Sequence, residues 1–317
     1  MSVYRVEGDL GTDGKIVIAR EISFEAESHL EQLFENSPFG LNEDEYIFWI
    51  GKQPRVQSEN RIIIPDLLGV DTEGNLIIVE FKRERAPREV IAQLLVYAAW
   101  ASKLSETEII DIAEAYFREH DVTASKFYDH FRDVFDIPDA SEIPKLNKRL
   151  RMFVVAGDIP EEVAHVCRWL RTSHRLNITC IEVSLFQTDA NEKYVDMEVK
   201  VGEENIDATL YPNDPERPEH SERPAKSTRR DIVYKIVKQL TGEDKSSTWT
   251  INEVFQKVKE KHPNWKKYSV IGPVLAGTVN SDARHLYPGA EDRYWRVKRG
   301  VYKLHDKEKF GSTPAAE

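Results

Sequence analysis

The chain has 317 residues, 40% of them apolar and 31% charged, which is the balance of a folded globular protein and excludes a disordered one. No apolar run approaches the roughly 20 residues that cross a bilayer, and the start MSVYRVEGDL lacks the pattern of a signal peptide, so we expect a cytoplasmic protein with no membrane partner. The formal net charge of −11 argues, as an average, against a nucleic-acid partner.

The charge is divided unevenly along the chain. Residues 1–222 hold 24 Lys and Arg against 44 Asp and Glu, a net charge of −20, whereas residues 223–317 hold 20 against 11, a net charge of +9. Lys and Arg bind nucleic acid by releasing the counterions condensed on its phosphates. The carboxyl-terminal part therefore favours a DNA partner, and a basic domain that is merely soluble is the alternative.

The first elements are a strand, a turn and a strand over residues 3–22, followed by a helix over residues 24–36 that Ser23 is placed to cap. Three strand-like apolar runs come next, at residues 46–57, 61–71 and 75–84. A helix with a broad apolar face is predicted over residues 88–103, after Pro87.

The later elements complete a pattern of mixed helices and strands. Helices are predicted at residues 106–119, 124–135 and 161–174, and strands at residues 151–158 and 177–187. This order predicts an α/β fold with a central mixed sheet over residues 1–205, a range that includes an N-terminal β extension at residues 1–22. Cys167 and Cys180 have no partners at metal-ligand spacing, so we expect buried free thiols in a reducing compartment.

A proline-rich, charged stretch at residues 206–227 predicts a linker, because it has too few apolar residues to form a core. A second compact unit follows over residues 228–310, and residues 311–317 are predicted to be a disordered tail. The unit combines a helix at 227–242, a helix capped by Thr250, a third helix at 268–282 interrupted at Pro273, and a closing hairpin in RYWRVKRGVYKLHD.

The residues that carry chemistry lie at the ends of two neighbouring strands. Alternation along a strand places Glu80 and Lys82 on one face and Phe81 on the other. An antiparallel partner strand, joined through the turn at residues 72–75, would bring Asp66 beside Glu80. Such a pair of carboxylates beside an ammonium suits Mg²⁺ or Mn²⁺ bound to a phosphate substrate.

The bare pattern of an Asp followed by Glu-x-Lys is common by chance, and this chain repeats it twice. Asp189 precedes Glu198 and Lys200, and Asp231 precedes Glu243 and Lys245. Only the Asp66 set lies between strongly apolar β runs, where burying charge is costly unless the charges act together. A surface salt bridge on a sheet edge is the alternative for that set.

The stretch IIIPDLLGVDTEGNLIIVEFKR resembles the core of PD-(D/E)xK nucleases, and QLLVY in the next helix is similar to the Q-x-x-x-Y element of RecB-like members. As a whole the region is similar to NucS-type endonucleases over about residues 23–190. The resemblance implies a restriction-endonuclease-like core that hydrolyses DNA phosphodiester bonds with a divalent metal. It implies these site residues: Asp66 and Glu80 on the metal, Glu31 (or Glu27, one turn earlier) as third acid, Lys82 at the water, and Gln93 and Tyr97 nearby.

The second unit resembles winged-helix domains of the HARE-HTH type, in which the third helix enters the major groove and the hairpin touches the backbone. Beside the cut site, Arg83, Arg85 and Arg88 could bind phosphates. In the second unit, the predicted DNA contacts are Lys266, Lys267, Ser269, Thr278, Asn280, Arg284, Lys298 and Arg299.

These observations predict a metal-dependent DNA endonuclease of restriction, defence or repair type, which could act as a homodimer. The alternatives are a DNA-binding regulator with an inactive nuclease core and a protein-interaction module. Binding to phosphates would weaken steeply with salt, whereas binding to a protein would weaken much less.

Overall fold

The computed structural model describes residues 2–41, 45–54, 56–58, 61–63, 65–120, 126–202, 229–263, 265, 267–280, 291–306 and 309. No helix in these ranges is long and apolar enough to cross a membrane. The predicted linker at 206–227 and the tail at 311–317 lie outside the described residues.

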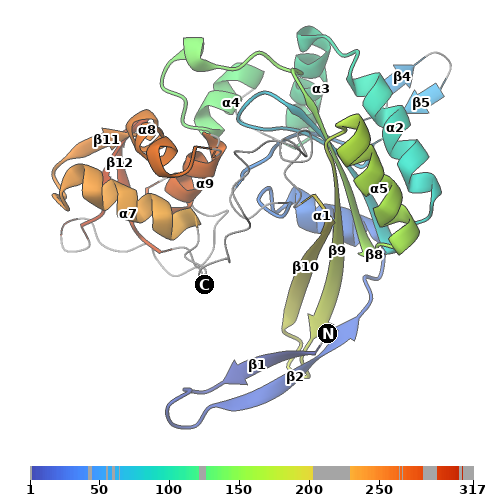
Figure 1. The fold of residues 1–317 in the computed structure, drawn as a ribbon, viewed down its shortest axis with the longest axis horizontal. Coiled ribbons are helices and arrows are strands. Elements are labelled where there is room, and N and C mark those ends of the chain that lie inside the picture. The colour runs from blue at the N-terminus through green and yellow to red at the C-terminus, as the bar shows by residue number, and fades with distance from the viewer. Residues whose placement is uncertain are drawn as a thin grey trace, which may run out of the picture.

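An eight-stranded mixed sheet forms the centre of the larger part, in the order β1-β2-β9-β8-β7-β6-β3, with β10 pairing with β9 (Figure 1). The strands of this sheet are β1 (Val3–Glu7), β2 (Lys15–Ile22), β3 (Phe48–Lys52), β6 (Leu67–Val70), β7 (Leu76–Arg85), β8 (Leu150–Asp158), β9 (Ile178–Gln187) and β10 (Lys193–Val201). Strand β8 is parallel to β7 and β9, whereas β6 is antiparallel to β7 and β3. The predicted α/β architecture with a mixed sheet is confirmed.

Helices cover both faces of this sheet. Leu30 and Phe34 of α1 (Glu27–Glu35) pack into the apolar cluster on one face. The other face packs against α2 (Glu89–Ala101), α3 (Glu106–Glu119), α4 (Phe127–Val134) and α5 (Glu161–His174). Because β7 is covered on both faces, its residues from Leu76 to Phe81 are all buried. The strand that carries the predicted catalytic residues is therefore held rigidly.

Three expectations about local structure are wrong. The apolar runs at residues 46–57 and 61–71 are not single strands. The first run divides into β3 and β4 (Val56–Ser58), and the second into β5 (Arg61–Ile63) and β6, and β4 pairs with β5 in a separate two-stranded sheet. Pro65 separates β5 from β6 and has no N–H to donate to a ladder. Ser23 does not cap α1 either, since the N-cap residue is Ala26 and it makes no side-chain bond.

The smaller part combines three helices with a three-stranded sheet in the order β11-β13-β12. Its elements are α7 (Arg229–Thr241), β11 (Thr248–Thr250), α8 (Ile251–Lys261), α9 (Tyr268–Gly277), β12 (Tyr294–Lys298) and β13 (Val301–Leu304). Thr250 caps α8 in a reciprocal capping box with Glu253, as predicted. The predicted hairpin is confirmed, and β11 joins it as a third strand that was not foreseen.

The two parts touch through the β12–β13 hairpin. Asp136, after α4, accepts a hydrogen bond from the Gly300 N–H (2.8 Å) and another from the Tyr302 hydroxyl. Phe39 and Tyr46 of the larger part pack against the apolar core of the smaller one. The hairpin that was expected to touch DNA is thus engaged with the larger domain.

Candidate active site

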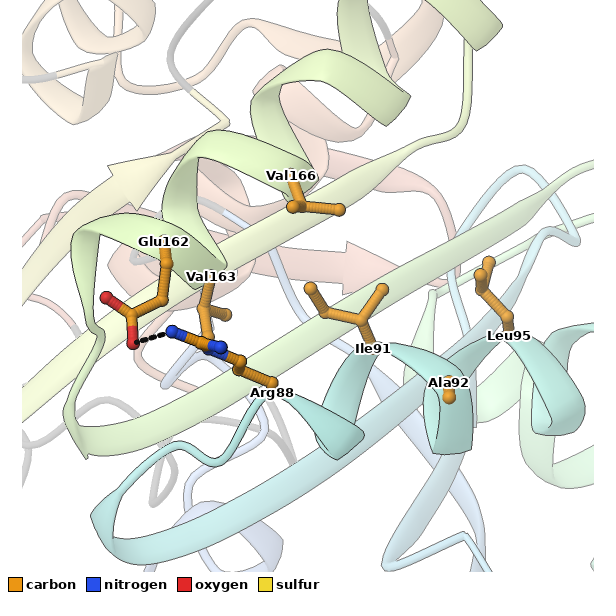
Figure 2. A pocket seen from close by; sticks show the side chains of 7 residues that line it. All are labelled: Arg88, Ile91, Ala92, Leu95, Glu162, Val163 and Val166. Carbon is orange, nitrogen blue, oxygen red and sulfur yellow. Dashed lines mark hydrogen bonds and ion pairs between the residues drawn. The ribbon is translucent and has the colours of Figure 1, made fainter.

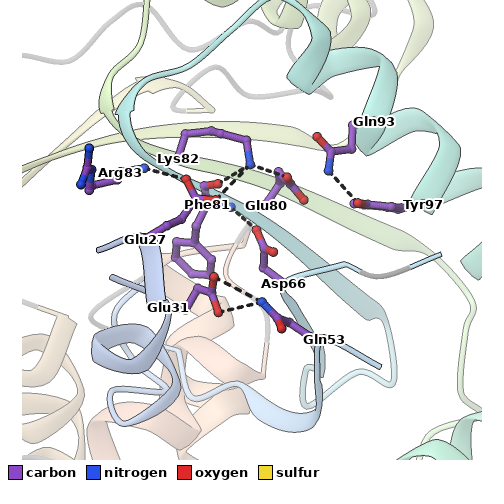
Figure 3. A network of polar contacts seen from close by, with 10 residues as sticks. All are labelled: Glu27, Glu31, Gln53, Asp66, Glu80, Phe81, Lys82, Arg83, Gln93 and Tyr97. Atoms are coloured by element: carbon purple, nitrogen blue, oxygen red, sulfur yellow. Dashed lines mark hydrogen bonds and ion pairs between the residues drawn. The ribbon is translucent and has the colours of Figure 1, made fainter. Parts of the chain in front are cut away.

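The start of β6 and the middle of β7 bring the predicted acid pair together. These strands are antiparallel with Leu67 opposite Val79, so Asp66, one residue before β6, falls beside Glu80. The Asp66 carboxylate accepts a hydrogen bond from the Phe81 backbone N–H at 2.7 Å (Figure 3). Pairing in this register is what the alternation of the two apolar runs predicted.

Lys82 lies on the same face of β7 as Glu80. Its ammonium donates to Glu80 Oε1 and to the Phe81 carbonyl, both at 2.7 Å, and lies 3.4 Å from Glu27 Oε1 (Figure 3). Burial lowers the pKa of Lys82, but the hydrogen bond to Glu80 and the nearby carboxylates outweigh burial, so the pKa is raised. Lys82 therefore stays cationic at neutral pH.

Glu80 is the most deeply buried acid of the cluster, with 1% of its surface exposed. Burial and then the negative charge of Asp66 raise the pKa of Glu80 to about 7, against the effect of Lys82. Within the described residues, its second oxygen, Oε2, is buried without a hydrogen-bond partner. A buried carboxylate oxygen with no donor is costly and is suited to a cation.

The first helix contributes both acids considered for the third position. Glu31, 4% exposed, accepts a hydrogen bond from the Gln53 amide at 3.2 Å, and burial followed by the charge of Asp66 raises its pKa. Glu27 faces Lys82 and accepts from the Arg83 N–H at 3.0 Å. Since i and i+4 are neighbours on a helix, one face of α1 presents both acids to the cluster.

Gln53 is a member of this cluster that the sequence did not reveal. Besides holding Glu31, its backbone N–H donates to the Asp66 carbonyl at 2.9 Å. Its φ of +43° is a left-handed conformation that is strained for a residue with a side chain. The sequence offered only a weak signal, a polar residue before Pro54 at the end of an apolar strand.

Gln93 and Tyr97 lie on α2 beside the acids, one turn apart. The Gln93 amide donates to the Tyr97 hydroxyl at 2.7 Å (Figure 3). Burial raises the pKa of Tyr97, the bond from Gln93 opposes that rise, and the charges of Glu80 and Asp66 add to it. The phenol therefore stays protonated and can donate a hydrogen bond near the carboxylates.

The three arginines at the end of β7 and just after it are paired with other groups. The Arg83 guanidinium donates to the Glu25 carbonyl at 2.9 Å and to Glu84. Arg85 pairs with Asp158 at 3.0 Å, and Arg88 with Glu162 at 3.4 Å. Arg88 lies at one end of a groove of about 500 Å³ between α2 and α5 that is otherwise mainly apolar (Figure 2).

A divalent cation would find oxygen ligands at this site. Across the described part of the chain, no group of three or more Asp, Glu, His or Cys side chains is arranged so that it could hold a metal ion. Mg²⁺ needs only one or two protein carboxylates, with water and substrate phosphate in the other positions. Asp66 and the partnerless Glu80 Oε2 match that requirement, so the residues present fit the ion.

The smaller part corrects several expected DNA contacts. Ser269 and Thr278 are buried, and the Thr278 hydroxyl donates to the Val274 carbonyl. Asn280 is occupied by the backbone of Arg296, to which it donates at 2.9 Å and from which it accepts at 2.7 Å. These three side chains are therefore engaged within the smaller part rather than presented to DNA.

The remaining expected contacts divide into three groups. Lys267 pairs with Glu142 at 3.3 Å and Arg299 pairs with Asp133, both on the larger part. Lys298 is exposed. Lys266 and Arg284 lie outside the described residues.

The third helix, α9, was expected to enter the major groove of DNA. Its burial in this structure contradicts that expectation. Its sequence, YSVIGPVLAG, is apolar on all sides, and the residues from Ser269 to Gly277 are buried. A helix that is apolar all round is a core helix. The order of helices in the sequence predicted a DNA-binding role for α9, whereas its lack of a polar face indicates a core helix that does not enter a DNA groove.

Comparisons with known proteins assign no activity. Residues 228–304 match a family described as a domain of unknown function (DUF7669). No curated protein matches the chain. Among solved structures, the chain is similar to EndoMS in a complex with dsDNA and to EndoMS in its apo form, with TM-scores of 0.26 and 0.24. Each match is 16% identical and covers 57% of this chain and 65% of the other, just under two thirds. Overlap of this extent is too small to support a function.

Proposed function

We propose that this protein is a divalent-metal-dependent endonuclease that hydrolyses DNA phosphodiester bonds, in restriction, defence or repair. The observation that carries the proposal is the convergence of Asp66, just before β6, with Glu80 and Lys82 in the middle of β7, with Glu80 Oε2 left without a partner among the described residues. Perturbed acids with a cation beside them, held on rigid elements, are typical of a catalytic site.

Asp66 and Glu80 would hold the ion, which is Mg²⁺ or Mn²⁺, and Glu31 would complete or position its shell. When bound, such an ion supplies charge neutralisation at the scissile phosphate and lowers the pKa of water. Because burial and the charge of Asp66 raise the pKa of Glu80 to about 7, a cation held by the two acids would favour the ionised form of that carboxyl.

Lys82 and the groups around it would orient the attacking water. Its ammonium is held by Glu80 and the Phe81 carbonyl and faces Glu27, so its charge is directed into the acid cluster. All three N–H groups of the ammonium have a partner here, so it would donate to a water molecule by giving up its longest bond, the one to Glu27 at 3.4 Å. Its positive charge would stabilise negative charge that develops on phosphate oxygens. The Tyr97 hydroxyl, which accepts a hydrogen bond from Gln93, would be a second hydrogen-bond donor to the site, from α2.

The smaller domain would recruit DNA, and its order of three helices and a terminal hairpin agrees with a winged helix. Residues 223–317 carry the net charge of +9. Since α9 is buried, phosphate contacts would fall to exposed lysines on the hairpin and α8, such as Lys298 and Lys259. Backbone contacts of this kind bind DNA without reading its sequence.

The test is nicking of plasmid DNA by purified protein in Mg²⁺ or in EDTA. We expect cleavage only with the metal, and a loss of about 100-fold or more in Asp66→Ala and in Lys82→Ala. Asp66→Ala would remove a carboxylate that holds the ion, and Lys82→Ala would remove a cation that stabilises negative charge in the transition state. Lys200→Ala is a matched control, since Lys200 lies two residues after Glu198 in the same local pattern and is bonded to it at 2.8 Å. If Asp66→Ala and Lys82→Ala cleave as fast as the Lys200→Ala control and the wild type, or if the wild type does not cleave, the proposal is overturned.

A further inference from the structure

A second ammonium group lies beside the acid cluster, at the edge of the central sheet. Lys52 is the last residue of β3 and lies opposite Leu67, which directly follows Asp66. The next residue in the chain, Gln53, holds Glu31 of the candidate site (Figure 3). Because β3 lies two strands from β7, its backbone is about 10 Å from that of β7.

The Lys52 ammonium is held in place by two side chains of α1. It donates to Glu35 Oε2 at 2.7 Å and to Gln32 Oε1 at 2.8 Å. An ammonium has three N–H donors, and among the described residues the third one of Lys52 has no partner. The side chain is 24% exposed, so an anion in solution can reach that donor. A fixed ammonium with one donor unused is suited to bind such an anion.

Glu35, which holds Lys52, is buried and has further partners. Its side chain is 7% exposed, and its Oε1 accepts a hydrogen bond from the Tyr116 hydroxyl at 2.8 Å and lies 3.3 Å from His120 Nε2. Two groups of α3 therefore satisfy this carboxylate besides Lys52. A structural ion pair, in which Lys52 only neutralises Glu35, is the alternative interpretation.

The two ends of α1 each hold a lysine. Glu27, the first residue of the helix, faces Lys82, and Glu35, the last residue, holds Lys52. Residues eight apart on a helix lie about 12 Å apart along its axis. The two ammonium groups are therefore anchored at points whose separation corresponds to three or four nucleotides of B-DNA, at about 3.4 Å for each.

We propose that Lys52 binds a phosphate of the DNA strand a few nucleotides from the bond that is cut. The inference rests on the proposed nuclease function and adds a residue that positions the substrate, with no part in the chemical step. Residues 1–222 carry a net charge of −20, so a DNA backbone that crosses them needs a cation where it meets the protein. Lys52, fixed beside the acid cluster, supplies that cation.

The first test is the binding of duplex DNA in Mg²⁺ at several salt concentrations, in a Lys82→Ala background that is not expected to cut. Lys52→Met should weaken binding about 10-fold and lower the slope of log K against log salt by about 1, because one phosphate contact is lost. Lys52→Arg should keep most of the affinity. Lys15→Met is the matched control, since Lys15 also pairs with a carboxylate, that of Glu7 at 3.0 Å, toward the opposite edge of the sheet.

A second variant separates a phosphate contact from a structural ion pair. Glu35→Gln breaks the same pair but keeps the ammonium and removes a negative charge, so DNA should bind as tightly as before or more tightly. If the pair only fixes α1 to β3, Lys52→Met and Glu35→Gln should weaken binding alike. Thermal melts show how much stability each variant loses, and in the protein that cuts, Lys52→Met should raise KM about 10-fold with little change in kcat.

Two results would overturn the proposal. One is wild-type affinity and salt dependence in Lys52→Met, and the other is an equal loss of binding in Lys52→Met and Glu35→Gln. If the wild type cleaves DNA, either result removes only the Lys52 contact and leaves the proposed function intact. Conversely, a lower salt slope in Lys52→Met, without cleavage by the wild type, supports the contact and rejects the nuclease.

Discussion

At the scale of single residues, the candidate site concentrates groups that are unfavourable on their own. Glu80 is buried beside Asp66 with an oxygen that has no partner, and Gln53 has a left-handed backbone. Each feature costs stability, on the order of 1–3 kcal/mol for a strained or unsatisfied group. Their concentration around three acids and one ammonium supports a functional rather than a structural reason for the arrangement.

Gln53 offers a test of that reason. Its strained backbone lowers the stability of the fold, whereas its side chain supports the site by holding Glu31. Gln53→Gly should relieve the strain at φ +43° and leave the melting temperature unchanged or higher, yet reduce nuclease activity about 10-fold, since Glu31 loses its amide partner. Gln53→Ala should show the same loss of activity without the gain in stability. Thermal melts and plasmid nicking measure both effects, and full activity in either variant would show that Glu31 does not need Gln53.

At the scale of elements, α4 shows how packing sets protonation. Its His130 ring lies edge-on to Phe48 and Phe117, with ring centroids 5.0 and 5.1 Å apart. Burial among these rings lowers the pKa of His130 in the folded protein. The neutral imidazole is therefore the form that the folded core accommodates.

A lowered pKa in the folded state makes the stability dependent on pH. The unfolded chain takes up a proton near pH 6.5 and the folded one only at lower pH, so acid favours unfolding. We expect the free energy of unfolding to fall as pH drops below about 6.5. His130→Gln should lessen that fall. Urea unfolding at pH 7.5 and pH 5.5 measures the free energy of unfolding of the wild type and of His130→Gln. An identical loss of stability in both would show that His130 is not the group responsible.

At the scale of the whole molecule, one buried carboxylate lies at the contact between the two parts. Asp136 is 2% exposed and accepts from the Gly300 N–H and the Tyr302 hydroxyl, with Arg296 at 3.4 Å. Gly300 itself, at φ +72°, lies so close to Pro138 that a Cβ would approach it to 2.9 Å. This close fit orients the hairpin and, with it, the smaller domain.

Asp136→Ala should weaken the union of the two domains. It leaves buried donors on Tyr302 and Gly300 without an acceptor, which costs about 3 kcal/mol. Calorimetry should show a separate, earlier transition for the smaller domain, and proteolysis should release it. Asp136→Asn is the control, because it keeps one acceptor oxygen and tolerates the φ of +50°, so its loss should be smaller. Single, unchanged melting of the Ala variant would show that other contacts hold the domains.

The sequence determined what depends on near neighbours in the chain. Alternation and a short turn were enough to place Asp66 beside Glu80 and Lys82, the apolar runs predicted the mixed sheet, and the Thr250–Glu253 spacing predicted a helix start. The roles of these site residues remain proposals, because position alone does not demonstrate chemistry.

Only the tertiary structure decided which groups from distant segments meet. Gln53, one residue after β3, reaches Glu31 on α1. Asp136 contacts a hairpin more than a hundred residues later, and α9 is buried although its order in the chain suggested a DNA-reading helix. The physical reason is that periodicity specifies the face of an element, whereas the surface that covers that face is chosen by packing between elements far apart in sequence.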